Sequence, residues 1–426
     1  MKQAPLIKLI ILICLLISFP TLAAPVGEPA GEIWIDGPED KQPAINPGHP
    51  DAAVDHLGRS IFVWDGNPAI NGGNDIYLRI FDSGSNPLGD PVRINTLLQY
   101  NQDHPRIAVS SDGSFLVIWQ SNEPFEDGAN ERRAVRSQAF DANAQPVGTE
   151  QLLNTLSTNG TTSIRADVAA LRDGGYVVAW QSGNTYGDDA NTSIQARRVD
   201  ALGEPVAEQF QVNSITGNDQ RGGAVTELAD GGFLVVWRIP NLRGRRFAAD
   251  GTPVGEGFQI NTLNLDDEFE PDAVLHEDGR VLVVWKDDDE PLNNWEIRGR
   301  LYSPSMAPQG DDFRINTLIS GAQENPRVAA YEQGGFFVVW DSAVSAGDDN
   351  DPTSVEGRIV TGRDQFAGPQ FQLNEWIEGN QIFPGIGGKN GRIAVAWDSP
   401  SGPDSPGSAI LGQFWYICGI FCDGFE

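Results

Sequence analysis

The chain has 426 residues, of which 48 are glycine and 28 are proline, and its formal net charge is -30 at pH 7. Such a surface repels nucleic acids and anionic membranes, so we expect no nucleic-acid partner, while cations and basic partners are attracted. The alternative interpretation is that the high acidity only keeps the protein soluble. The many turn residues and the lack of a sustained helical period predict an all-β chain.

The first 23 residues have the three parts of a secretory signal peptide. Lys2 and Lys8 make the start basic, an apolar run extends from Leu9 to Ile17, and small residues follow up to Ala23. We predict residues 1–23 as a signal peptide and a mature protein that is secreted, periplasmic or at the cell surface. No later stretch approaches the ~20 apolar residues of a membrane span, so none is expected.

A strand that ends in tryptophan recurs seven times along the rest of the chain. An apolar run precedes each tryptophan, usually after an Asp-Gly turn, as in Asp230-Gly231 before Phe233 to Trp237. The seven tryptophans are Trp64, Trp119, Trp180, Trp237, Trp285, Trp340 and Trp397. Another short strand comes before each turn. After each tryptophan come a variable loop, a third strand and, in six units, a fourth strand that ends in Asn. Each unit spans about fifty-five residues, within the range of propeller blades.

The apolar runs do not alternate with polar residues, which indicates strands buried on both faces. One four-stranded sheet cannot bury both faces, whereas sheets packed around a common axis can. We therefore predict a seven-bladed β-propeller over residues 24–416, with four antiparallel strands per blade. The tryptophans are interpreted as core rather than as sugar-stacking platforms, because each ends the same strand of its unit. The Arg or Gln of the third strand recurs in every unit and is interpreted as structural: Arg79, Gln138, Arg197, Arg245, Arg300, Arg358 and Gln413.

The loops between strands 2 and 3 and between units should share one face of the propeller. They are long, variable and acidic, and such loops usually carry binding. Oxygen-rich loops suit Ca²⁺, which takes about six to eight oxygen ligands; the alternative is solvated loops without a metal. The candidate calcium ligands are Asp188, Asp189, Asp287, Asp288, Asp289, Asp348, Asp349 and Asp351. Ca²⁺ is the one cofactor considered.

The fourth unit departs from the repeat, since its loop between strands 2 and 3 shrinks to residues 238–242 and is locally basic. Arg245 matches the repeated third-strand position, whereas Arg238 and Arg243 are less explained by the repeat and are candidates for an anion-binding notch. Trp295 and Trp376 lie outside the repeated tryptophan position and are candidates for exposed ligand contacts on the same face.

No recognisable catalytic constellation is present, so no catalytic residue is predicted. The segment Trp237-Arg238-Ile239-Pro240 is similar to the Phe-Arg-Ile-Pro signature of sialidases, but it lies in the middle of the chain and the turns lack the sialidase Asp-to-Trp spacing. The histidines show no metal-ligand spacing. His49 and His104 each precede a proline and are interpreted as equivalent loop positions of the repeat.

The last unit, which extends to Gln413, has no fourth strand ending in Asn after it. The segment from Ile33 to Ile35 is similar to the fourth strands, with Asp36 in place of the usual Asn. We predict that this N-terminal strand pairs into the last blade and closes the ring.

Residues 417–426 form a tail that contains Cys418 and Cys422. An exported compartment permits a disulfide between them, whereas a zinc site would need further ligands that the surrounding sequence lacks.

The repeats resemble those of exported bacterial proteins with Asp-Gly-Gly-Phe-Val-Val-Val-Trp-type segments, here Asp230-Gly231-Gly232-Phe233-Leu234-Val235-Val236-Trp237. The ending Asp423-Gly424-Phe425-Glu426 resembles the short tails of some exported bacterial proteins. This resemblance implies a propeller and a sorting or processing role for the tail, but no particular activity.

Three functions remain open from the sequence. The first is an exported, monomeric binding module for an extracellular protein or glycan. The second is a polysaccharide-acting propeller hydrolase or lyase that uses acidic loop residues as catalysts. The third is a Ca²⁺-stabilised surface adhesion component.

Overall fold

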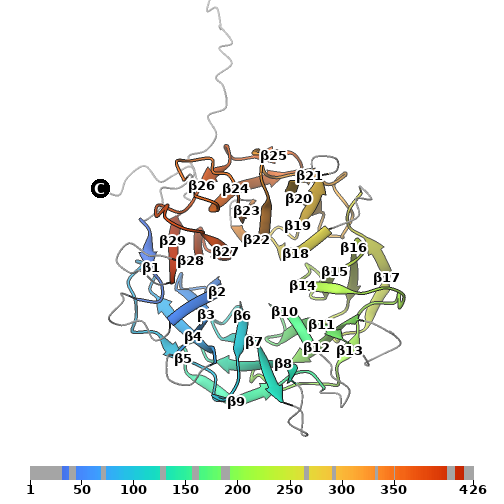
Figure 1. Cartoon of the computed structure of the whole chain (residues 1–426). Coiled ribbons are helices and arrows are strands. Elements are labelled where there is room, and N and C mark those ends of the chain that lie inside the picture. Colours follow the sequence, from blue (N-terminus) through green and yellow to red (C-terminus); the bar gives the residue numbers. More distant parts are fainter. Residues whose placement is uncertain are drawn as a thin grey trace, which may run out of the picture.

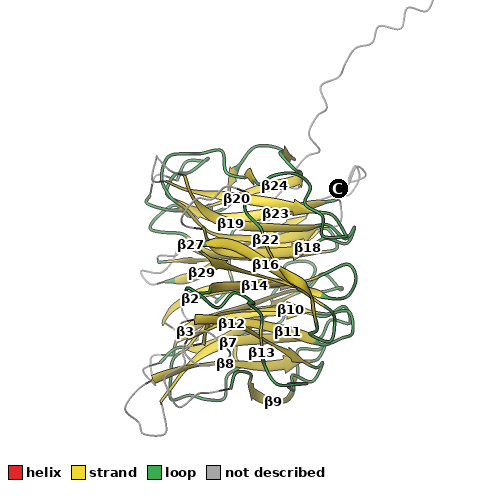
Figure 2. Ribbon diagram, turned by 90° about the vertical axis from the view of Figure 1, so that its right-hand side faces the viewer, coloured by secondary structure: helices red, strands yellow, loops and turns green. Residues whose placement is uncertain are grey.

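In the computed structural model, the described residues are 31–37, 45–68, 73–124, 131–155, 163–183, 192–262, 268–289, 294–331, 334–349, 351–400 and 408–416. This part of the chain contains strands and no helix. Seven sheets stand around a central axis (Figure 1), and Figure 2 shows the ring from the side, with the sheets as twisted layers. The predicted seven-bladed, all-β propeller is confirmed. No helix in the described residues is long and apolar enough to cross a membrane.

Each blade is an antiparallel meander of four strands whose first strand lies nearest the axis. The first three blades consist of β2 (Ile45–Val54), β3 (Ser60–Asn67), β4 (Asp75–Phe81) and β5 (Val92–Arg93); β6 (Gln102–Val109), β7 (Phe115–Pro124), β8 (Glu131–Phe140) and β9 (Pro146–Leu152); and β10 (Ser163–Ala170), β11 (Tyr176–Gly183), β12 (Thr192–Val199) and β13 (Phe210–Gln211).

Blades 4 to 7 follow the same order around the ring. They consist of β14 (Arg221–Glu227), β15 (Phe233–Ile239), β16 (Asn241–Phe247) and β17 (Pro253–Gln259); β18 (Glu268–Leu275), β19 (Val281–Asp289), β20 (Asn294–Tyr302) and β21 (Phe313–Arg314); β22 (Gln323–Tyr331), β23 (Gly335–Ser342), β24 (Ser354–Gly362), β25 (Gln365–Phe366) and β26 (Phe371–Gln372); and β27 (Ile382–Lys389), β28 (Arg392–Ser399), β29 (Ala409–Tyr416) and β1 (Ile33–Trp34). In blade 6 the fourth strand is divided into two short segments, β25 and β26, that both pair with β24.

The second strand of each blade forms the core. All seven repeat tryptophans are at most 1% exposed, and the buried clusters extend across neighbouring blades. Trp180 of blade 3, for example, shares one cluster with Ile118 and Val135 of blade 2. The interpretation of these tryptophans as core is confirmed, because no ligand can reach a ring that both blades cover.

Two recurring polar residues hold the blades in register. The Asn that ends the fourth strand accepts a hydrogen bond from a backbone N–H of the third strand in six blades, at 2.8–3.0 Å. The Arg of the third strand donates to a backbone carbonyl of the preceding blade, as in Arg197 to Leu153 and Arg245 to Val212, both at 2.8 Å. Four of these arginines also lie over an aromatic ring, which confirms their structural role.

The N-terminal strand closes the ring, as predicted. In β1, Ile33 pairs with Gly412 and Trp34 pairs with Leu411 of β29. The N–H of Ile35 donates to the carbonyl of Ile410 at 2.8 Å, and the Ile35 side chain is fully buried. Residues from the two ends of the propeller therefore share one sheet. The predicted signal peptide and the tail with Cys418 and Cys422 lie outside the described residues.

Candidate binding site at the mouth of the axial channel

Every innermost strand carries a bulge at the same place near its beginning. The pairing with the second strand shifts register there in all seven blades. One residue of each bulge has a left-handed φ between 47° and 65°: His49, His104, Arg165, Gly222, Glu270, Asn325 and Phe383. A left-handed φ is uncommon for residues with a Cβ, and bulges often re-aim a side chain. We call these seven residues the mouth ring.

The mouth ring surrounds a pocket of about 220 Å³ at one end of the propeller axis, and all seven of its residues line this pocket. The pocket lies at the beginnings of the innermost strands, hence on the face with the loops between blades. Two further hollows, of about 310 and 550 Å³, follow along the axis, and each shares lining residues with its neighbour. The mouth ring is therefore the entrance of an axial channel.

In blades 2 and 3, the residue after the repeat tryptophan supports the bulge of the next blade. Gln120 accepts a hydrogen bond from the N–H of Arg165 at 3.3 Å, and Gln181 accepts one from the N–H of Gly222 at 3.0 Å. Blades 4 and 5 have Arg238 and Lys286 at this position, and a cation cannot accept a hydrogen bond. This exchange of acceptor for cation marks blades 4 and 5 as different from the rest.

Cations and aromatic rings replace that support in blades 4 and 5. The Arg238 guanidinium lies 3.9 Å from the ring centre of Phe269, within cation–π range. Lys286 forms an ion pair with Glu324 at 2.9 Å and lies 3.8 Å from Glu270. In blade 6 the N–H of Asn325 is held by the Glu270 carboxylate at 3.0 Å.

A second ring of charged residues lies two positions further along the innermost strands. Its members are Asp51, Arg106, Asp167, Asp272 and Arg327, with Ala224 and Gly385 in the remaining two blades. Each aspartate accepts a hydrogen bond from a backbone N–H of the next blade, at 2.8–3.0 Å. These carboxylates therefore join neighbouring blades around the channel.

The three aspartates of the second ring bind protons more readily than ordinary aspartates. Burial raises the pKa of Asp51. It also raises the pKa of Asp167 to about 6 and, together with the charge of Asp167, the pKa of Asp272 to about 8. Asp167 and Asp272 keep some exposed area because they border the channel, but they lie deep beneath the surface. At neutral pH, Asp272 is therefore largely protonated and Asp167 largely ionised, so the ring keeps part of its negative charge.

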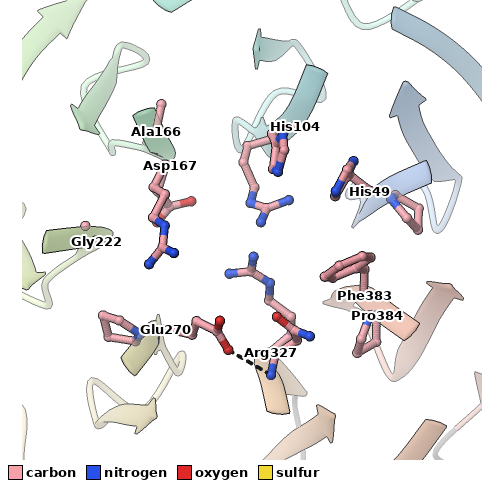
Figure 3. A pocket seen from close by; sticks show the side chains of 15 residues that line it. His49, His104, Ala166, Asp167, Gly222, Glu270, Arg327, Phe383 and Pro384 are labelled. Atoms are coloured by element: carbon pink, nitrogen blue, oxygen red, sulfur yellow. Dashed lines mark hydrogen bonds between the residues drawn. The ribbon is translucent and has the colours of Figure 1, made fainter. Parts of the chain in front are cut away.

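Three arginines, Arg106, Arg165 and Arg327, line the pocket, and Figure 3 labels Arg327 among the lining side chains. Among the described residues, no carboxylate oxygen lies within 4.0 Å of a guanidinium nitrogen of these three arginines, so none of them forms a salt bridge there. Arg106 donates only to the carbonyl of Pro105, at 3.0 Å. Their hydrogen-bond donors are therefore available to a ligand.

The opposite wall of the pocket is aromatic. The rings of His49 and His104 stack with centres 3.8 Å apart, and Phe383 lies 4.9 Å from His49. Figure 3 shows these side chains on one side of the pocket and Glu270 on the other, with Arg327 between them. The pocket thus combines a cationic part with a flat aromatic part.

The structure brings two predicted site residues together and separates two others. Trp295 meets Phe269 edge-on at 5.4 Å, so Trp295 and Arg238 both pack around Phe269, next to the mouth ring. Arg243 pairs with Trp237, whereas Arg238 pairs with Leu242. The two arginines therefore point to opposite faces of the blade 4 sheet, because adjacent positions of a strand alternate. Trp376 is half-buried against the core of blades 6 and 7.

The predicted calcium ligands are scattered. Asp287 is buried beside Arg298, at 3.3 Å, and Asp349 accepts a hydrogen bond from Asn374 at 2.7 Å. Asp288, Asp348 and Asp351 lie in the described loops and strands, while Asp188, Asp189 and the side chain of Asp289 lie outside the described residues. In the described part of the chain, no three His, Cys, Asp or Glu residues are placed to hold a metal ion. The calcium site stays a prediction.

Sequence reasoning missed the three arginines and gave the two histidines no role. The available signal was positional: His49-Pro50, His104-Pro105-Arg106 and Asn325-Pro326-Arg327 occupy equivalent places in their blades.

Comparisons with known proteins support the fold alone. No protein-family model matches the sequence, and no curated protein is similar to it. A protein of unknown function from Dyadobacter fermentans has a TM-score of 0.52 at 12% identity, covering 92% of this chain and all of that one. A fungal alcohol oxidase of the AA5 family in complex with copper has a TM-score of 0.56 at 13% identity, covering 92% and 77%. The polysaccharide lyase Uly1 has a TM-score of 0.50 at 8% identity, covering 90% and 94%.

Proposed function

We propose that this protein is a binding propeller whose axial pocket takes a carboxylate-bearing sugar, a uronate. The observation that carries the proposal is that Arg106, Arg165 and Arg327 line one pocket, with no salt bridge to a described carboxylate, in a chain of net charge -30. The signal-peptide pattern of residues 1–23 predicts that the ligand is met outside the cytoplasm.

The arginines favour an anion. Guanidinium groups bind carboxylates, sulfates and phosphates through paired, charge-assisted hydrogen bonds. Such bonds are stronger inside a pocket than at an open surface, because the surrounding dielectric is lower. The acidic outer surface repels anions in general, so an anion that binds here must be recognised locally. The acid group of the ligand is therefore assigned to the arginine side of the pocket.

The aromatic wall favours a ring beside that acid group. The aromatic side chains of His49, His104 and Phe383 line the pocket, with Pro50 and Pro384 beside them. Ligand pockets typically combine such apolar walls with a few polar groups that fix orientation. Glu270 and Asn325 line the other side and can bond hydroxyl groups. A sugar ring with a carboxylate satisfies both walls.

Isothermal titration calorimetry with glucuronate, glucose, sulfate and phosphate tests the proposal. We expect saturable binding of glucuronate and at least tenfold weaker binding of glucose. Arg165→Ala should weaken glucuronate binding about tenfold or more, the worth of a charge-assisted hydrogen bond. Arg165 is exposed, so its truncation should leave the fold intact. Arg246→Ala, which removes an arginine paired with Asp230, is the matched control and should bind normally.

Equal binding of glucose and glucuronate would overturn the proposal. Tighter binding of sulfate or phosphate than of glucuronate would reassign the pocket to another class of anion.

A further inference from the structure

His49 is held in the geometry of a positioned base. Its Nδ1 lies 2.9 Å from Oδ1 of Asp65, and the other oxygen of Asp65 accepts a hydrogen bond from the side-chain amide of Asn74 at 2.7 Å. Asp65 is only 2% exposed, so its carboxylate is fixed on both sides. This arrangement assigns the Nδ1 proton to the Asp65 side and leaves Nε2 as the basic nitrogen of the ring.

The charges around His49 set its protonation. Burial lowers the pKa of His49 and the charge of Arg106 lowers it further, but the hydrogen bond and the charge of Asp65, with Asp398, raise it more. The net pKa of His49 therefore lies above the ordinary value of a histidine. Above that pKa the ring is a neutral base that is stronger than a free imidazole.

The base and the arginines meet in one pocket. Figure 3 shows the ring of His49 pointing from the innermost strand of blade 1 into the pocket, which Arg106 lines too. Arg106 is also close enough for its charge to act on the imidazole. A carboxylate bound by Arg106 would thus place its neighbouring carbon beside His49. The stacked His104 ring restricts rotation of the His49 ring.

We infer that the axial pocket also cleaves uronate-containing polysaccharides by β-elimination, with His49 as the catalytic base and Asp65 as its positioning residue. This inference rests on the proposed function, because it needs the uronate carboxylate at the arginines. Binding of the carboxylate by guanidinium groups makes the proton on the adjacent carbon more acidic, since it stabilises the negative charge that develops when that proton leaves.

The step balances without an added oxidant or reductant. Nε2 of His49 takes the proton from the carbon that bears the carboxylate. The electron pair of that C–H bond forms a C=C bond to the next ring carbon, where the C–O bond to the linked sugar breaks. The leaving oxygen takes the proton from the His49 imidazolium, which restores the neutral base. The products are an unsaturated uronate end and a new hydroxyl end.

The test uses the mature chain on polygalacturonate, alginate and a neutral glucan, and follows the ultraviolet absorbance of the conjugated product. We expect product from at least one uronate polymer and none from the glucan. His49→Ala should lower kcat at saturating polymer about 100-fold or more, as expected for loss of a general base, whereas weaker binding through the lost ring would raise KM. His56→Ala, outside the pocket, is the matched control and should keep full activity.

Asp65→Asn separates a positioning role from a purely structural one. It should move the acidic limb of the pH–rate profile to lower pH, because it removes the charge that raises the pKa of His49. Binding of glucuronate without any unsaturated product would overturn this inference and leave the proposed function standing. Full activity in His49→Ala would also overturn it. If the wild-type chain neither binds glucuronate nor forms the unsaturated product, the proposed function itself is refuted.

Discussion

The position that ends the fourth strand of each blade is buried and polar. Asp36 is the one ionisable residue at this position. Six blades have an Asn there, whose side chain accepts a backbone hydrogen bond. Asp36 takes this position in the seventh blade and is only 1% exposed. Burial raises its pKa to about 8, although backbone hydrogen bonds and the charge of Arg79 oppose the shift. An ionised Asp36 is therefore costly in the folded protein.

Replacing Asp36 by Asn should stabilise the propeller above neutral pH. The pKa of Asp36 in the folded state lies above the unfolded value of 3.8, so the contribution of Asp36 to stability is fully present below pH 3.8 and is lost as pH rises towards 8. Asp36→Asn removes this loss, and we expect a gain of roughly 5 kcal/mol at pH 8 and little at pH 4. Thermal melting at both pH values measures it. The reverse change, Asn213→Asp, should create the same pH-dependent loss; an unchanged pH dependence in both variants would contradict the explanation.

The repeated residues were predictable from the sequence, whereas the pocket was not. Tryptophan, Asn and Arg recur because each performs the same structural task in every blade, and repetition made them visible. The mouth ring is variable by nature: His49, Arg165, Glu270 and Phe383 share a position but no chemistry. Six of its seven members are not glycine, so the sequence carried no sign of their left-handed backbone.

At the level of elements, the innermost strand and the closing strand have different tasks. The innermost strands use their bulges to turn side chains into the channel, at the cost of regular pairing. The closing strand β1 uses regular pairing with β29 to join the two ends of the chain. Its sequence similarity to the other fourth strands made closure predictable. The bulges depend on contacts from the preceding blade, such as the hydrogen bond between Gln120 and Arg165. These contacts cannot be predicted from the sequence of the bulged strand alone.

Weakening the closing strand should destabilise the whole ring. Ile35 is fully buried between blades 7 and 1, so Ile35→Ala should cost about 2–4 kcal/mol. Deletion of residues 24–37 should lower the melting temperature further, because the Arg79 bond to the carbonyl of Ile35 is lost as well. Ile377→Ala, at an exposed site, is the control. A melting temperature unaffected by the deletion would show that another contact closes the ring.

On the scale of the whole molecule, the pocket lies where all seven blades meet. Its lining comes from every blade, and the His49 and Phe383 rings, 4.9 Å apart, face each other across the seam between blades 1 and 7. Ring closure and ligand binding therefore involve the same seam at different distances from the axis. Strand β1 connects the blades at the outer rim, and the pocket is shared by the blades at the axis. A ligand held by both walls of the pocket should stabilise the ring even where β1 is weakened.

Glucuronate should therefore restore part of the stability that Ile35→Ala loses. A ligand that binds only the folded state stabilises it by about 2.7 kcal/mol at a concentration of 100 times Kd, which is comparable to the expected cost of the substitution. We expect glucuronate to raise the melting temperature of Ile35→Ala at least as much as that of the wild type, and glucose to raise neither. The rise should shrink at high salt, since the contacts are charged, and it should fall to about half or less when Arg165→Ala is added. An equal rise with and without Arg165 would place the ligand elsewhere on the molecule.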